Sequence, residues 1–238
     1  MSAPHTVIVG GSSGIGLATA RTLLDAGQKV SIAGRSAERL ESAAKLLDGR
    51  AQAVVMDAAN VESVTRTLET IGAFDHLVLA LGSTKGAGPF ALVDLAEVRQ
   101  GFDEKVFPHF ATAQAALPFL AQDGSITFVS AVTAHAAIPG TAGIGAANAA
   151  VAALVPILAA ELKPIRVNGV SPGVIDTPWW DFLPADVRTS LFADYAAKTP
   201  VGRVGTPDDV ARAVAFLVTN GFMSGEVIIC DGGLRLAG

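Results

Sequence analysis

A run of glycines and serines near the start of the chain has the residue types and spacing that bind phosphate groups. The segment 10–16, Gly-Gly-Ser-Ser-Gly-Ile-Gly, follows an apolar run at 5–9 and precedes a helix-like stretch that ends at Gly27. In a strand–turn–helix context, the N–H groups at the helix start face an anion such as a pyrophosphate. A plain turn is the alternative, and this context makes it the weaker one. The residues expected to bind the nucleotide are Gly10, Ser12, Ser13, Gly14, Ile15 and Gly16.

The elements that must position this turn can be predicted along the whole chain. Apolar runs predict strands near 6–9, 29–33, 52–56, 76–81, 125–130, 165–170 and 226–230. Helical patterns fill the intervals near 14–26, 37–47, 60–71, 95–120, 143–162 and 207–219. Continuous apolar strands that alternate with helices predict a doubly wound α/β fold, with a parallel sheet of about seven strands and helices on both faces. Ligands of such folds bind at the carboxyl ends of the strands.

Length and composition narrow the function classes. The chain of 238 residues fits a single domain over 1–238, and half of its residues are hydrophobic. The net charge of −5 and the lack of a basic run argue against a nucleic-acid partner. No segment has the pattern of a secretion signal, which predicts a cytoplasmic protein. The apolar stretch 144–162 contains an asparagine, a proline and a glutamate, so we expect a buried helix and no membrane partner. The four histidines lack metal-ligand spacing, so no metal site is expected.

One long stretch, 176–206, interrupts the alternation of strands and helices and is expected to be irregular. It contains two tryptophans, Trp179 and Trp180, and the only tyrosine of the chain, Tyr195. A long aromatic excursion from a compact domain is typical of a lid or a binding loop.

Together these motifs resemble the short-chain dehydrogenase/reductase family over nearly the whole chain. The glycine motif matches the cofactor signature of that family, and Asp231-Gly232-Gly233 matches its C-terminal signature. The segment 166–173, Arg-Val-Asn-Gly-Val-Ser-Pro-Gly, looks like its sixth strand and the turn that follows. The resemblance implies a Rossmann-type fold, a nicotinamide cofactor and hydride transfer to or from a small molecule. The further cofactor contacts that it implies are Asp57 and Ala58 at the adenine, Gly82, Pro172, Gly173, Ile175, and Thr177 at the nicotinamide amide.

The end of the second strand indicates which nicotinamide cofactor is bound. NAD-specific members of the family carry an acidic residue there, whereas this chain has Gly34 followed by Arg35 and Ser36. A guanidinium can bind a 2′-phosphate with two hydrogen bonds, and an acid would repel it. We therefore predict NADP(H), with Arg35 and Ser36 as contacts, although Arg35 could also be a solvated residue at a helix start.

The usual catalytic residues of the family are missing. Alignment puts Ile144 at the tyrosine position, Asn148 at the lysine position, Ala131 at the serine position and Lys105 at the asparagine position. Because an isoleucine side chain carries no transferable proton, the usual mechanism cannot operate as such.

The lysine and the asparagine look exchanged between the two positions, and this argues against simple loss of function. Lys105 and Asn148 would then reach the nicotinamide from opposite helices, and Asn148 would also bind the cofactor. Ser130, next to Ala131, could orient a carbonyl, although a hydrogen-bonded serine at a strand end is an equal alternative. The proton donor is left open among Tyr195, His135 and Lys105.

Three hypotheses about the function remain. The first is an NADP-dependent oxidoreductase that acts on a carbonyl or alcohol, with an apolar or aromatic substrate suggested by Trp179 and Trp180. The second is a non-catalytic NADP-binding protein, such as a pseudoenzyme or a redox sensor. The third is a lyase or isomerase on the same scaffold. In each reading a homo-oligomer, a tetramer or a dimer, is expected, because the two long helices carry more apolar surface than one sheet face needs.

Overall fold

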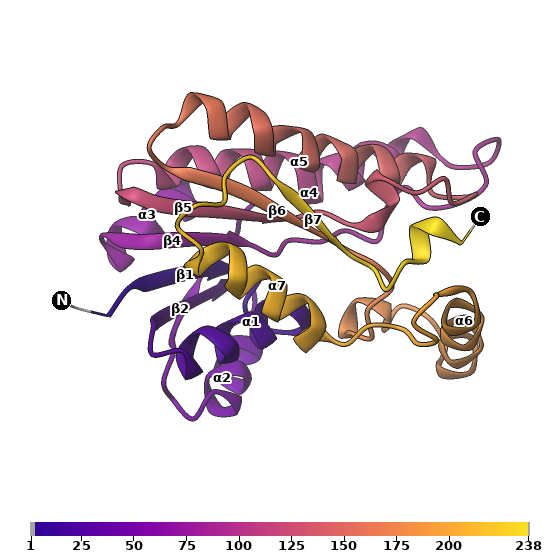
Figure 1. Cartoon of the computed structure of the whole chain (residues 1–238), viewed down its shortest axis with the longest axis horizontal. Helices are drawn as coiled ribbons and strands as arrows, with labels where there is room; N and C mark the ends of the chain where they lie inside the picture. Colours follow the sequence, from indigo (N-terminus) through magenta and orange to yellow (C-terminus); the bar gives the residue numbers. More distant parts are fainter. Residues whose placement is uncertain (1–2, 238) are drawn as a thin grey trace.

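The computed structural model describes residues 3–237, and within that range it contains one parallel sheet of seven strands (Figure 1). The strand order is β3-β2-β1-β4-β5-β6-β7, and every neighbouring pair is parallel. The predicted doubly wound α/β fold is therefore confirmed. The strands are β1 (His5–Val9), β2 (Lys29–Gly34), β3 (Gln52–Val55), β4 (Phe74–Leu79), β5 (Leu120–Val129), β6 (Arg166–Pro172) and β7 (Val227–Cys230).

Helices cover both faces of the sheet (Figure 1). One face carries α3, α4 and α5, and the other carries α1, α2 and α7. The helices are α1 (Gly14–Asp25), α2 (Ala37–Leu46), α3 (Val61–Ile71), α4 (Leu95–Ala116), α5 (Ala142–Glu161), α6 (Ala185–Lys198) and α7 (Pro207–Thr219).

Two hydrophobic cores form because side chains alternate along each buried strand. In β1, Val7 and Val9 pack under α3, α4 and α5, whereas Ile8 packs under α1 and α7. In β4, Leu77 and Val78 divide between the two cores in the same way. Strands that are apolar at consecutive positions are thus buried on both faces of the sheet.

The stretch 176–206 is more regular than its sequence suggested. It contains a short 3₁₀ turn at Pro178–Trp180 and the helix α6, which begins just after Pro184. No residue of α6 is fully buried, and only the side with Leu191, Phe192 and Tyr195 is partly covered. A partly covered face gives a weak periodic signal, so the sequence did not predict α6.

The helix α5 is the most apolar of the α-helices described within residues 3–237. By length and composition alone it could cross a membrane, with 20 residues and a mean hydropathy of 1.9. In the fold it lies beside α4 and packs Val151 and Val155 against the sheet. One face of α5 is thus used by the core, while eight of its 20 residues are exposed in the single chain.

Candidate active site

Most of the residues that the sequence singled out lie at the carboxyl edge of the sheet, in or next to the loops that follow β1 to β6. Lys105 lies within α4, and Asn148 lies within α5. The strands run from left to right in Figure 1, so this edge faces α6. The central strands β1 and β4 are neighbours there, and the strand order reverses between them. A reversal of strand order opens a crevice for a ligand at this edge.

The loop after β1 is held against the neighbouring strands by its backbone. Gly10 and Gly11 both donate their N–H groups to the Ala33 carbonyl at the end of β2. A Cβ on Gly10 would collide with the Ala80 carbonyl, and a Cβ on Gly16 would collide with the Gly10 carbonyl. These glycines therefore let the first turn of α1 approach the sheet.

The helix that starts in this loop lacks a side-chain cap. Ser13 occupies the N-cap position of α1 but accepts no hydrogen bond from the first turn. The helices α5 and α6 also lack such a cap, whereas α2, α3, α4 and α7 are capped by the side chain of their N-cap residue. Because Ser13 does not cap α1, the first N–H groups of this helix are free to face an anion.

The loops after β2 and β3 carry the residues expected at the adenine end of a cofactor. Arg35 is exposed, and its guanidinium makes no hydrogen bond or ion pair within residues 3–237. Ser36 is the N-cap of α2 and accepts from the Arg39 N–H at 3.2 Å. Asp57 is exposed, and its carboxylate accepts from the Ala59 N–H at 3.1 Å. The adjacent Ala58 is buried.

The loop after β4 connects to α4 and to the segment after β6. The Ser83 hydroxyl donates to the Glu104 carboxylate at 2.7 Å, and the Trp179 indole N–H donates to the Ser83 carbonyl at 3.2 Å. A Cβ on Gly82 would lie 3.4 Å from the Trp179 ring. Sequence analysis gave no role to Ser83 or Glu104, because their residue types and spacing match no motif.

Lys105 points into the protein from α4. Its side chain is buried, and Nζ donates to the Ser130 carbonyl at 3.2 Å, just beyond the end of β5. Burial lowers the pKa of Lys105 from 10.5 to about 8. One turn later His109 contacts two carbonyls, those of Lys105 at 2.7 Å and Leu79 at 3.2 Å. Burial lowers the pKa of His109 to about 3.

Asn148 reaches the same region from α5. Its Nδ2 donates to the Ile144 carbonyl and to the Thr133 hydroxyl, both at 2.9 Å. Its Oδ1 is buried and has no hydrogen-bond partner among residues 3–237. Lys105 and Asn148 thus bond to the same segment, 130–133, from two different helices. An acceptor that is left buried without a donor is costly unless a ligand or a water satisfies it.

The expected catalytic set also includes Ser130 and the tyrosine position, which holds Ile144. Ser130 is only 4% exposed, and its hydroxyl accepts from the Ala131 N–H at 2.6 Å. Ile144 is partly exposed in the first turn of α5, where its N–H donates to the Gly86 carbonyl. Sequence analysis did not select Thr133. A hydroxyl two residues after Ala131 was the one signal that could have indicated it.

The segment after β6 closes against the glycine loop. Pro172 ends β6, the Gly173 N–H donates to the Cys230 carbonyl of β7, and Ile175 is buried. Thr177 follows, and a Cβ on Gly14 would lie 3.3 Å from its side chain.

An aromatic cluster continues this segment. Its members are Trp179, Trp180, Phe182 and, from α6, Phe192. The two tryptophan rings meet edge to face, with their centroids 4.6 Å apart. Tyr195 lies on α6 and His135 is exposed after η1, the 3₁₀ turn Val132–Ala134.

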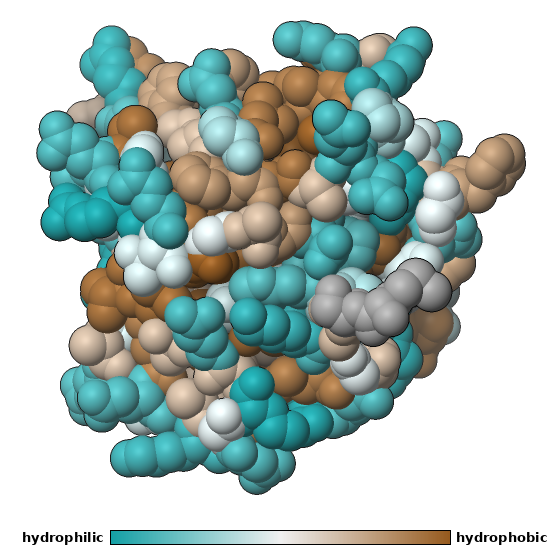
Figure 2. Space-filling view, turned by 90° about the vertical axis from the view of Figure 1, so that its left-hand side faces the viewer, coloured by the Kyte–Doolittle hydropathy of each residue, from teal (hydrophilic) through white to brown (hydrophobic). Residues whose placement is uncertain are grey.

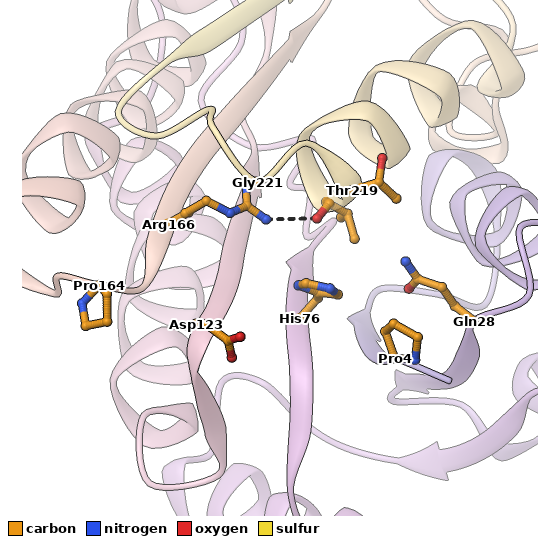
Figure 3. A pocket seen from close by; sticks show the side chains of 9 residues that line it. Pro4, Gln28, His76, Asp123, Pro164, Arg166, Thr219 and Gly221 are labelled. Atoms are coloured by element: carbon orange, nitrogen blue, oxygen red, sulfur yellow. Dashed lines mark hydrogen bonds between the residues drawn. The ribbon is translucent and has the colours of Figure 1, made fainter. Parts of the chain in front are cut away.

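A separate cavity of about 510 Å³ lies at the opposite, amino edge of the sheet. His76, Asp123 and Arg166 line it (Figure 3), and the surface on this side mixes hydrophilic and hydrophobic residues (Figure 2). The Arg166 guanidinium is already used, because it donates to the Leu217 and Val218 carbonyls at the end of α7. None of the site residues selected from the sequence lines this cavity.

Comparison with known proteins finds relatives that align with nearly the whole chain. A family model described as "Enoyl-(Acyl carrier protein) reductase" matches residues 9–235. The chain is 34% identical over 240 residues to a cis-4-hydroxycyclohexanecarboxylate dehydrogenase of Sinomonas cyclohexanicum, with 95% of this chain and 94% of the relative covered.

Two solved structures extend the likeness to three dimensions. A small-chain dehydrogenase in complex with NADPH has a TM-score of 0.84 at 33% identity, with 98% of this chain and 99% of that chain covered. The apo structure of a short chain oxidoreductase from Pseudomonas aeruginosa PAO1, described as containing an atypical catalytic center, has a TM-score of 0.87 at 31% identity, with 97% of each chain covered. This chain is therefore a member of the short-chain dehydrogenase/reductase family of oxidoreductases.

Proposed function

We propose that this protein is an NADP-dependent oxidoreductase that transfers a hydride between nicotinamide and a carbonyl or alcohol carbon at a non-standard active site. The observation that carries the proposal is the convergence of Lys105 and Asn148 on segment 130–133 from α4 and α5. An ammonium and an amide are thereby held at the carboxyl edge of the sheet, although the tyrosine and lysine positions of the family hold Ile144 and Asn148.

Three features of the site fit a dinucleotide with a 2′-phosphate. The uncapped start of α1 suits the pyrophosphate. The exposed Arg35 makes no other polar contact within the described chain and suits the 2′-phosphate. The unpartnered Oδ1 of Asn148 suits a ribose hydroxyl, which would satisfy a buried acceptor. The NADPH complex of a protein that is 33% identical supports the same choice of cofactor.

In this proposal the chain's own residues bind, orient and protonate, while bound NADPH supplies the hydride. Asn148 holds the ribose. Lys105 stabilises the negative charge that develops on the substrate oxygen, because an ammonium acts more strongly when it is withdrawn from water. Since burial lowers the pKa of Lys105 to about 8, its ammonium can also release the proton that the oxygen needs. Ser130 remains a candidate for orienting the substrate.

The segment 176–206 is proposed as a substrate lid on a single domain that spans residues 1–238. The Trp179 indole already contacts the loop after β4, next to Gly82. The aromatic cluster around it would line the substrate side of the site, which favours an apolar or aromatic carbonyl compound. The relative that is named for a cyclohexane substrate supports including cyclic ketones among the test compounds.

The outer surface of α4 and α5 supports assembly as a homo-oligomer. Phe107, Phe110 and Ile157 are each about half exposed or more. Next to Phe107, Val98 and Phe102 line an open hollow on α4. A large apolar patch on two adjacent helices is typical of an interface between copies with closed symmetry.

The cofactor assignment can be tested by titrating NADPH and NADH against tryptophan fluorescence, since Trp179 adjoins the proposed site. We expect NADPH to bind more tightly by about 1–3 kcal/mol, the range for charge-assisted hydrogen bonds. Arg35→Ala should remove most of this preference. Arg39→Ala, one turn further along α2, is the matched control and should keep it. Equal affinities of the wild-type protein for both cofactors would contradict the assignment.

The second candidate function is a non-catalytic NADP-binding protein. Ile144 favours it, because the position expected to carry the transferable proton has an aliphatic side chain. Binding of NADPH without hydride transfer to any carbonyl compound would separate this candidate from the first.

A further inference from the structure

The amide of Asn148 determines how the Thr133 hydroxyl is oriented. A carbonyl oxygen can only accept, so the Asn148 atom that lies 2.9 Å from the Ile144 carbonyl must be the donor Nδ2. The same NH₂ group lies 2.9 Å from the Thr133 hydroxyl oxygen, which therefore accepts its second hydrogen. The hydroxyl proton of Thr133 must point elsewhere, and it has no acceptor within residues 3–237.

Thr133 is also better exposed to a substrate than the other hydroxyl at this strand end. It lies in η1 and is partly exposed. Ser130 is almost fully buried, and its hydroxyl is held by the Ala131 N–H.

Close contact with α5 keeps Thr133 in place. A Cβ on Gly145 would lie 2.9 Å from the Thr133 carbonyl oxygen, so a glycine is needed there for η1 to pack on the first turn of α5. Asn148 Nδ2 then joins the Thr133 hydroxyl to the carbonyl of Ile144, the residue at the tyrosine position.

We propose that the Thr133 hydroxyl donates a hydrogen bond to the carbonyl oxygen of the substrate. This inference rests on the oxidoreductase function proposed above. The hydrogen bond polarises the carbonyl and makes its carbon a better hydride acceptor, and the Thr133 proton is not transferred. Asn148 acts as a positioning residue for this hydroxyl, because its amide leaves the hydroxyl proton free.

The test is the infrared C=O stretch of a ketone labelled with ¹³C at its carbonyl and bound to the protein with NADP⁺, where no hydride is available. The probe is acetophenone, with cyclohexanone as a second ketone. A hydrogen bond to the oxygen lowers the stretching frequency relative to the ketone in hexane. We expect a lowered frequency in the wild type and in Thr133→Ser, and loss of this lowering in Thr133→Val.

Thr141→Val is the matched control, because the Thr141 hydroxyl already donates to the Ile138 carbonyl at 2.8 Å. It should leave the lowered frequency unchanged. An unshifted stretch in the wild type, an equal shift in Thr133→Val, or failure of both ketones to bind would overturn the proposal.

Kinetics separate this inference from the function on which it rests. Thr133→Val should lower kcat/KM for ketone reduction at least tenfold, Thr133→Ser should recover most of the loss, and the Kd of NADPH should stay unchanged in both. If the wild-type protein shifts the C=O stretch but never oxidises NADPH, the redox function is contradicted and the hydrogen bond from Thr133 is still supported. Equal turnover in the wild type and in Thr133→Val would contradict the role of Thr133 but not the oxidoreductase function.

Discussion

Replacing Lys105 by methionine should make the protein more stable at neutral pH and less active. The drop in the Lys105 pKa from 10.5 to about 8 means that burial of the ammonium costs about 3 kcal/mol of folding free energy. The substitution removes this cost but leaves the Ser130 carbonyl without its donor, which costs about 1–3 kcal/mol. We therefore expect the variant to be more stable by up to about 2 kcal/mol at pH 7. Turnover should fall at least tenfold, about 1.4 kcal/mol in the barrier, with NADPH affinity much less affected.

The difference in stability between the wild type and Lys105→Met should change sign as the pH rises. Between about pH 8 and 10.5 the unfolded chain keeps the Lys105 proton and the folded chain loses it, so the wild type gains stability as the pH rises. Above that range the lysine is neutral in both states, and Lys105→Met should be the less stable protein because of the unpaired carbonyl.

Urea unfolding of the apo protein at pH 7 and near pH 10.5 measures both differences. Lys45→Met, which removes an exposed lysine from α2, is the matched control and should show no reversal. A Lys105→Met protein that is less stable than the wild type by the same amount at both pH values would refute the argument, because the ammonium would then not be desolvated.

Three further results are expected. Ketone reduction should slow as the pH rises through about 8, because it needs the Lys105 ammonium, whereas alcohol oxidation should become faster over the same range. Profiles of kcat/KM against pH measure both effects. A profile that stays flat through pH 8 in both directions would exclude Lys105 as the proton donor. Asn148→Leu should weaken NADPH binding, measured by fluorescence titration, since Oδ1 would no longer accept from the ribose; unchanged affinity would remove Asn148 from the cofactor site. Light scattering at micromolar concentration should show a dimer or tetramer, and Phe107→Asp should dissociate it; a monomeric wild type would contradict the interface on α4 and α5.

Much of the fold could be predicted because its signals are local. The glycine turn after β1 and the alternation of apolar strands with helices locate β1 to β7 and six of the helices described within residues 3–237 to within a few residues. The largest boundary error lies between α4 and β5. The helix ends at Ala116, shortly before Pro118, whereas the strand starts at Leu120 and runs through Asp123 and Gly124, residue types that disfavour strands.

The candidate site was only partly predictable. The positions of Lys105 and Asn148 followed from the family resemblance, and the structure directs both side chains to segment 130–133. The link from Ser83 to Glu104 joins residues 21 apart, and the contact between Trp179 and Ser83 joins residues 96 apart. Neither pair has a spacing rule, so only the folded chain reveals them.

The central claim is that the exchanged lysine and asparagine still support hydride transfer. Stopped-flow measurement of NADPH absorbance, after the NADPH complex is mixed with a panel of aromatic and cyclic ketones, tests this claim most directly. The account predicts that at least one ketone oxidises bound NADPH in a single turnover and that Lys105→Met slows this step at least tenfold. Product formation with unchanged NADPH would indicate a lyase or isomerase, and bound NADPH that no ketone oxidises would contradict the account and favour a non-catalytic NADP-binding protein.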